Sequence, residues 1–244
     1  MNKPRTRTRK QPSVRVSVVV PTLNEEANVA GCIDSLKRQS LKPLEIIIAD
    51  GGSTDATRSI AKKRGAVVVV EKTRTIAAGR QRGSRAAKGE IIAYTDADAV
   101  LPENWLEELA KPFCDARVSC VFGSLRLSDA TLLERLLSRV LAIAFAASAF
   151  VGSPSGAGSC MAVRASAFRK SGGFDTRLVT AEDVDLQKKL KKFGRVVYAP
   201  AAVASVSPRR VRKWGYPKFI LFHLRNWFKA SFLGTPECNY EPVR

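Results

Sequence analysis

The sequence predicts an α/β fold with a mostly parallel, Rossmann-like sheet flanked by helices and a C-terminal amphipathic helical extension. Apolar runs of strand length alternate with helical stretches through the first half of the 244 residues, as is typical of βαβ units. Polar residues follow directly on several of these runs. Because open α/β sheets bind ligands at the carboxyl ends of their strands, the fold class itself indicates where a site lies.

The expected elements follow one another at short intervals. In chain order they are strand Val16–Val20, helix Glu25–Gln39, strand Leu44–Ala49, helix Asp55–Arg64, strand Ala66–Glu71, helix Ile76–Ala87 and strand Glu90–Tyr94. Pro102 and Glu103 then mark a helix start. A further strand and helix are expected in Cys160–Phe168.

The chain has the length of one domain with an ordinary hydrophobic core. Its net charge of +19 is concentrated in two segments. Residues 1–15 hold six basic residues and residues 186–236 hold twelve, with no acid in either, so the remaining 23 basic residues balance the 22 acidic ones. We therefore divide the chain into a disordered basic arm (1–14), a folded domain (15–208) and a basic, aromatic extension (209–244). The five cysteines lack the spacing of a zinc site.

Two apolar segments do not have the pattern of a membrane span. Leu132–Gly152 is apolar, but its uninterrupted part is shorter than the ~20 residues that a bilayer requires, so it is expected to be buried or interfacial. Pro217–Leu233 mixes aromatic with basic residues, a pattern typical of interfacial helices. The alternative is a terminal helix packed on the core. The arm lacks the apolar region of a secretory signal, so we expect a cytoplasmic, peripherally membrane-associated protein that binds anionic lipid.

Asp96 and Asp98 are the most informative residues of the sequence. They follow the apolar run Ile91–Tyr94 directly, at the predicted carboxyl end of a strand. Carboxylate oxygens are ligands that Mg²⁺ and Mn²⁺ prefer, and such ions bridge protein carboxylates to substrate phosphates. The pair therefore predicts a site for Mn²⁺ or Mg²⁺, against the alternative of a solvated turn.

Four segments in a fixed order make the chain similar to a known family. They are VSVVVPTLNEE (16–26), EIIIADGGSTDAT (45–57), the Asp96–Asp98 pair, and SGGFD (171–175) with TAED (180–183). This order resembles the family-2 glycosyltransferases with the GT-A fold, over about residues 14–200. The resemblance implies transfer of a sugar from a nucleotide diphosphate, of the UDP or GDP type, to a sugar or lipid-linked acceptor.

The resemblance also implies roles for single residues. The nucleotide-sugar site would comprise Pro21, Thr22, Asn24, Glu25, Asp50, Arg80 and Asp96. Asp98, with Asp96, would hold the metal ion. Asp183 would be the general base of an inverting displacement, and Glu182 would orient the acceptor or the base. Capping boxes are the alternative for Glu25 and Asp183, because a threonine precedes each by three residues.

The sequence departs from the family pattern at one point. Many relatives supply a metal-binding histidine after the base, whereas residues 201–210 contain none. The QxxRW signature of processive synthases is absent too, which favours transfer of a single sugar. Two other classes stay open, namely a basic nucleic-acid-binding module and a sugar nucleotidyltransferase. The balanced charge of the predicted domain argues against nucleic acid as a partner.

Overall fold

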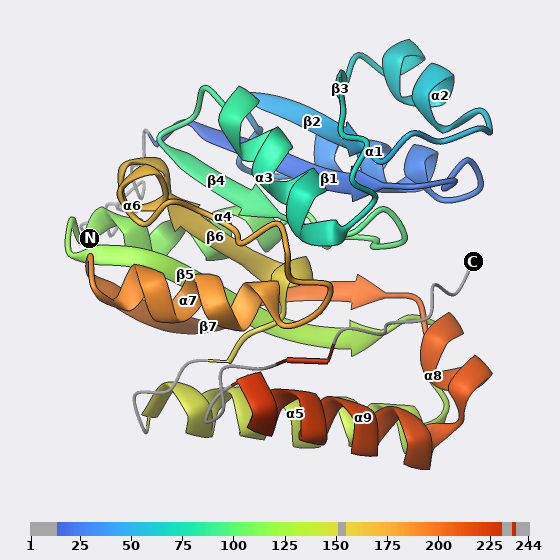
Figure 1. The fold of residues 1–244 in the computed structure, drawn as a ribbon, viewed down its shortest axis with the longest axis vertical. Coiled ribbons are helices and arrows are strands. Elements are labelled where there is room, and N and C mark those ends of the chain that lie inside the picture. Colours follow the sequence, from blue (N-terminus) through green and yellow to red (C-terminus); the bar gives the residue numbers. More distant parts are fainter. Residues whose placement is uncertain (1–13, 151–154, 231–235, 238–244) are drawn as a thin grey trace, which may run out of the picture.

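The computed structural model describes residues 14–150, 155–230 and 236–237. Within them, one seven-stranded sheet has the order β3-β2-β1-β4-β6-β5-β7 (Figure 1). The strands are β1 (Val16–Thr22), β2 (Glu45–Asp50), β3 (Val67–Val70), β4 (Ile91–Tyr94), β5 (Val118–Leu127), β6 (Met161–Arg164) and β7 (Arg195–Val206). Neighbouring strands are parallel except where β6 pairs with β4 and β5. The predicted α/β class with a mostly parallel sheet is confirmed.

Helices cover both faces of the sheet because its central strands are apolar on both sides. In β1, Val18 and Val20 belong to one buried cluster and Val19 to the other, as expected when successive side chains point to opposite faces. The first cluster includes residues of α1 (Val29–Lys37), α2 (Thr57–Lys63) and α4 (Trp105–Ala110). The second includes residues of α3 (Ile76–Ala86), α6 (Ala165–Lys170) and α7 (Glu182–Lys191).

Three further helices, α5 (Leu132–Phe150), α8 (Arg209–Trp214) and α9 (Tyr216–Phe228), lie at the end of the molecule away from β1–β3 (Figure 1). The fully buried Glu134 of α5 joins them. Its carboxylate accepts hydrogen bonds from Arg212 Nε and Nη2, both at 3.0 Å, and from the hydroxyl of Tyr216 at 3.1 Å. These bonds hold the pKa of Glu134 down to about 2, so α8 is firmly tied to α5.

The predicted extension packs on the domain through α9. Asn226 is buried, and its Oδ1 lies 3.1 Å from the hydroxyl of Thr180, just before α7. The division at residues 208 and 209 stays a prediction. The predicted basic arm lies outside the described residues except for its last residue, Val14, which is half-buried.

Three predicted helix starts are wrong, and two strands were not predicted. The helix expected from Glu25 begins at Val29, and the helix expected from Asp55 begins at Thr57. The C-terminal helix begins at Tyr216, and its predicted end, residues 231–233, lies outside the described residues. Strands β5 and β7 were not expected.

Among the described residues, no helix is both long and apolar enough to span a bilayer.

Candidate functional site

The predicted site residues gather at the carboxyl ends of three neighbouring parallel strands. Thr22 ends β1 and Asp50 ends β2, and the two residues are paired in register. Pro21 lies one residue earlier in β1, opposite Ala49. Asp96 and Asp98 follow β4, which pairs with the other side of β1. The sheet order therefore brings together side chains that are up to 77 positions apart in the sequence.

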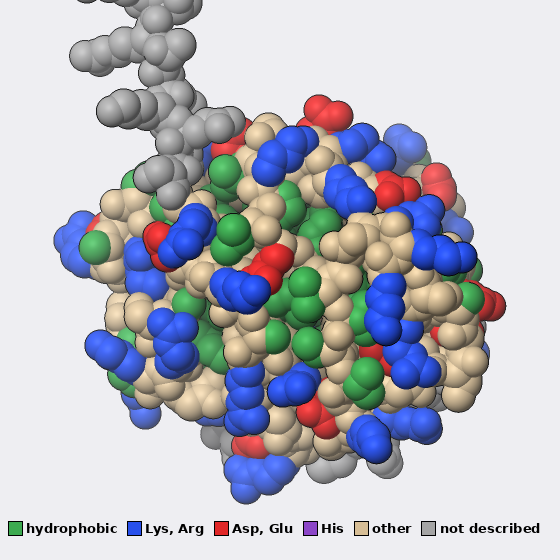
Figure 2. All heavy atoms as spheres, turned by 90° about the horizontal axis from the view of Figure 1, so that it is seen from above, with side chains coloured by type: hydrophobic (Ala, Val, Ile, Leu, Met, Phe, Trp, Pro, Cys, Tyr) green, Lys and Arg blue, Asp and Glu red, His purple; other side chains and the backbone are tan. Residues whose placement is uncertain are grey.

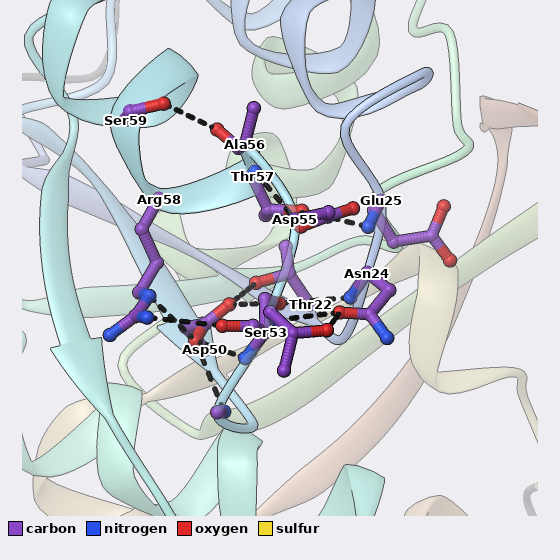
Figure 3. Close-up of polar contacts among 12 residues, drawn as sticks. Thr22, Asn24, Glu25, Asp50, Ser53, Asp55, Ala56, Thr57, Arg58 and Ser59 are labelled. Carbon is purple, nitrogen blue, oxygen red and sulfur yellow. Dashed lines mark hydrogen bonds and ion pairs between the residues drawn. The ribbon is translucent and has the colours of Figure 1, made fainter.

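Asp50 organises the loop that follows β2 (Figure 3). The residue is fully buried, and its Oδ1 accepts hydrogen bonds from the backbone N–H groups of Gly52 (3.1 Å) and Ser53 (2.9 Å). Its Oδ2 accepts from the hydroxyls of Thr22 (3.2 Å) and Ser53. Gly52 has a φ of 85°, which favours glycine. Asp50 thus shapes the loop, and its contact with a nucleobase stays a prediction.

Asn24 and Glu25 tie the loop after β1 to the loop after β2 (Figure 3). Asn24 donates its backbone N–H to Ser53 Oγ, and Glu25 donates its own to Thr57 Oγ1 at 2.8 Å. The capping-box alternative for Glu25 is wrong, because the N-cap of α1 is Asn28 and the Thr22 hydroxyl bonds to Asp50. The Glu25 carboxylate instead accepts a 2.7 Å hydrogen bond from Asn28 Nδ2 and pairs with Arg209.

Arg80 links the Asp96 carboxylate to the start of α7. Its side chain is 3% exposed, and the guanidinium lies 2.9 Å from Asp96 Oδ1 through Nη2 and 2.7 Å from Glu182 Oε1 through Nη1. Burial works against the charged form, but Asp96 and Glu182 outweigh it and raise the pKa of Arg80. The predicted role of Arg80 at the nucleotide stays a prediction, since what the geometry gives is a bridge between two carboxylates.

Because Gly158 has no side chain, the Arg80 guanidinium can occupy the space beside it. A Cβ atom added at Gly158 would lie 2.0 Å from Arg80 Nη1. The backbone N–H of the same glycine donates a 2.8 Å hydrogen bond to Asp183 Oδ2. One glycine therefore admits the arginine and also orients the candidate base, and the sequence did not single it out.

Glu182 and Asp183 open helix α7 beside Arg80. Burial and then the neighbouring Asp183 raise the pKa of Glu182 to about 7, and burial also raises the pKa of Asp183. The capping-box alternative for Asp183 is wrong as well. The N-cap of α7 is Ala181, with a φ of 56°, and the Thr180 hydroxyl lies 2.6 Å from the backbone oxygen of Glu237. The raised pKa values make this pair a suitable proton acceptor.

Asp98 has a partner that the sequence did not indicate. Its Oδ2 lies 3.1 Å from Nε of Arg209, whose Nη2 lies 2.7 Å from Glu25 Oε1. Burial and the charge of Asp96 raise the pKa of Asp98 to about 6. The sequence analysis assigned Arg209 only to the basic, aromatic extension, whereas the structure pairs its guanidinium with the carboxylates of Glu25 and Asp98.

The carboxylates fit a divalent ion that a substrate helps to hold. No group of three or more histidine, cysteine, aspartate or glutamate side chains in metal-binding arrangement occurs among the described residues. Asp98 and Asp96 nevertheless supply the oxygen donors that Mg²⁺ and Mn²⁺ prefer. Magnesium is commonly bound by one or two carboxylates together with substrate phosphates. The donor set therefore suits an ion that enters with a nucleoside diphosphate.

Comparison with known proteins shows the family. The model of glycosyl transferase family 2 matches residues 17–172, more than half of the chain, and the chain belongs to this family. The succinoglycan biosynthesis protein ExoA of Rhizobium meliloti is 28% identical over 198 residues, 72% of this chain and 58% of ExoA. The pre-mycofactocin glycosyltransferase of Mycobacterium tuberculosis is 30% identical over 218 residues, 82% of this chain and 44% of the relative. The chain thus spans about half the length of these relatives.

Solved structures agree on the fold. The mannosyltransferase PcManGT from Pyrobaculum calidifontis, in complex with GDP-Man and Mn²⁺, superposes with a TM-score of 0.71 at 27% identity, covering 93% of this chain and 66% of that chain. Glucosyl-3-phosphoglycerate synthase from Mycobacterium tuberculosis has a TM-score of 0.60 at 21% identity. The predicted GT-A fold is therefore confirmed.

Proposed function

We propose that this chain is an inverting glycosyltransferase that moves one sugar from a nucleoside-diphosphate sugar to an acceptor hydroxyl. The observation that carries the proposal is the Arg80 bridge. The Arg80 guanidinium contacts the carboxylates of both Asp96, after β4, and Glu182, which directly precedes Asp183 in α7. Donor and acceptor groups would meet at this point, with the nucleotide at the strand ends and the base at α7.

The proposed reaction is a single displacement at the anomeric carbon. The acceptor oxygen attacks the anomeric carbon from the face opposite the leaving group, the bond from that carbon to the diphosphate oxygen breaks, and Asp183 takes the hydroxyl proton. The Gly158 N–H fixes the Asp183 carboxylate for this role. Arg80 and Glu182 hold their positions through an ion pair that is shielded from water.

Asp98, with Asp96, would hold Mn²⁺ or Mg²⁺. Such an ion neutralises negative charge that grows on a departing diphosphate. Mn²⁺ is present in the complexes of PcManGT and glucosyl-3-phosphoglycerate synthase. The nucleotides in those complexes, GDP-Man in the first and UDP in the second, make GDP- and UDP-sugars the first donors to test.

A panel of melting temperatures tests the proposal. UDP-, GDP- and dTDP-sugars are added with Mn²⁺, with Mg²⁺ or with EDTA. We expect one donor class to raise the melting temperature in Mn²⁺, since ligand that binds only the native state stabilises it by mass action. Stabilisation by a nucleoside triphosphate with a sugar phosphate, but by none of the nucleotide sugars, would favour a nucleotidyltransferase. Stabilisation by nucleic acid alone would contradict any sugar transfer.

We further propose that α5 and α9 rest on an anionic membrane, at the cytoplasmic face, where a lipid-linked acceptor would be met. Both helices expose large apolar side chains to solvent. These are Leu132, Leu133, Leu136, Val140, Leu141, Ile143 and Phe150 on α5, and Ile220, Leu221, Leu224, Trp227 and Phe228 on α9. Exposed apolar patches of this kind mark protein or membrane contacts, and Arg135, Arg139, Lys218 and Arg225 on the same helices suit anionic lipid.

Charge alone would not orient the protein on a bilayer. Lys and Arg side chains are spread over the opposite end of the molecule too (Figure 2). The apolar side chains of α5 and α9 must therefore select the face that meets the lipid, and substitutions should test them rather than the basic residues.

Leu221→Gln combined with Leu224→Gln is expected to weaken binding to phosphatidylserine-containing vesicles by about tenfold or more. The two leucines are 68% and 59% exposed, so the change removes apolar area without disturbing the core, and burial of each would be worth about 1.5–3 kcal/mol. Glutamine keeps the helix propensity. Vesicle sedimentation measures the bound fraction.

A matched control places glutamine at Val67 and Val70, two exposed apolar residues of β3 at the other end of the molecule. This control should bind vesicles like the unmodified protein. If the leucine variant also binds like the unmodified protein, α9 does not contact the bilayer.

A further inference from the structure

We propose that Arg209 is a diphosphate-binding residue of the donor site, supplied by α8 and oriented by Glu25. The inference rests on the proposed function, because it assigns a new contact to the donor that this function requires. It also offers an explanation for the absence of the metal-binding histidine that many relatives have after the base. In this chain, the segment after β7 supplies a cation to the site instead of a metal ligand.

The position of Arg209 carries the inference. Its guanidinium lies between Glu25, after β1, and Asp98, after β4, with contacts of 2.7 Å and 3.1 Å. Strands β1 and β4 are paired neighbours. The cation therefore lies at the carboxyl ends of the central strands, where an α/β sheet receives the phosphates of a nucleotide.

The hydrogen bonds of Arg209 leave donors for an anion. Nη2 and Nη1 donate to the two oxygens of Glu25 at 2.7 and 3.3 Å. The guanidinium has five N–H donors, and its other donors make no hydrogen bond to a described residue, although Nε lies near Asp98. Glu25 holds the edge formed by Nη1 and Nη2, and Nε faces Asp98, but the Arg209 side chain is 30% exposed, so its remaining N–H groups can reach phosphate oxygens.

The local charge requires a cation at this point. Glu25 and Asp98 both contact the Arg209 guanidinium, and Asp96 lies two residues before Asp98, so three carboxylates meet at the same place. Arg80 balances Asp96 but is shared with Glu182. A diphosphate that approaches these carboxylates meets repulsion unless positive charge accompanies it. A divalent ion at Asp98 supplies part of that charge, and Arg209 supplies the rest.

Helix α8, which carries Arg209, is itself anchored to the rest of the domain. Arg212, three residues later in α8, donates two hydrogen bonds to the fully buried Glu134 of α5. This anchor fixes α8 relative to the sheet, so the Arg209 side chain is pre-organised. A pre-organised guanidinium loses less side-chain entropy when it binds an anion.

The experiment measures binding of UDP and GDP by calorimetry in EDTA and in Mn²⁺, with uridine and guanosine as phosphate-free probes. Arg209→Gln is expected to weaken the binding of the preferred nucleoside diphosphate in EDTA by about ten- to a hundredfold, the worth of a charge-assisted hydrogen-bonded pair. Affinity for the matching nucleoside should not change. The control Lys213→Gln removes the same charge from an exposed position of α8 and should bind like the unmodified protein.

Each outcome decides the proposal. If Arg209→Gln binds the diphosphate as tightly as the unmodified protein, or more tightly, Arg209 is only a counter-ion of the carboxylates and the inference is overturned. If glutamine prevents folding, Arg209→Lys decides, because it keeps a charge beside Glu25 but lacks the planar fork. We then expect a loss of several-fold for the diphosphate alone, and unchanged affinity overturns the inference. Absence of nucleotide binding by the unmodified protein, even in Mn²⁺, would instead contradict the proposed function.

Discussion

Asp183→Asn is expected to lower turnover by about 10²–10⁴-fold, the usual contribution of a positioned proton acceptor. Asparagine has nearly the same shape but cannot take the acceptor proton at neutral pH. The donor site should be little affected, because the Asp183 carboxylate bonds to the N–H groups of Gly158 and Val184 rather than to the residues around Asp98. Turnover, melting temperature and nucleotide affinity should be measured on the same preparation.

Asp185→Asn is the matched control for this substitution. It removes the same charge from the same helix, where Asp185 pairs with Lys189 in a half-exposed contact. Such pairs contribute little to stability, so its turnover should stay close to that of the unmodified protein. If Asp183→Asn retains full turnover with an alcohol acceptor, Asp183 is not the base. Retention only with a polyprenyl phosphate would mean that the acceptor is ionised before attack.

The sequence was sufficient to predict which candidate residues lie at the carboxyl ends of the strands. Asp50, Asp96 and Asp98 each follow an apolar run, and parallel strands bring such positions to one edge of the sheet. No contact between distant segments had to be known. The local pattern and the handedness of βαβ units determine the outcome, and the family match over residues 17–172 is consistent with this prediction.

The start of α1 could not be predicted from local pattern. Helix signals indicate a start near Glu25, but Asn24 has a φ of 54° and bonds to the loop after β2. Long-range hydrogen bonds from their backbone N–H groups to the hydroxyl oxygens of Ser53 and Thr57 hold residues 24 and 25 outside the helix. Tertiary contacts thus override the local preference and leave the Glu25 carboxylate to hold Arg209.

Arg209 was missed because nothing local distinguishes it from its basic neighbours. It is separated from Glu25 by 184 positions, and only the fold brings the two together. Strand β7, which leads to it, contains Pro200 and several alanines and pairs with β5 through two register shifts. Neither feature is typical of a strand, so the position of the following segment could not be inferred.

Asp98→Asn is expected to lower turnover by about 10²–10⁴-fold, since a metal ion contributes several kcal/mol to transition-state stabilisation. The substitution keeps the shape of the side chain and removes the charge that a divalent ion requires. The rise in melting temperature that Mn²⁺ adds to nucleoside diphosphate should disappear. Because burial already disfavours the charged form of Asp98 and raises its pKa, loss of the charge should not unfold the protein.

The decisive comparison for Asp98 is between EDTA and Mn²⁺. Because Glu25 still holds Arg209 through two hydrogen bonds, Asp98→Asn should bind nucleoside diphosphate in EDTA about as well as the unmodified protein. The variant should gain nothing when Mn²⁺ is added, whereas the unmodified protein should gain. Asp34→Asn, a half-exposed residue that pairs with Arg64 away from the site, should respond to Mn²⁺ like the unmodified protein. If Asp98→Asn keeps both its turnover and its response to Mn²⁺, the metal ion is held elsewhere and Asp98 serves only to pair with Arg209.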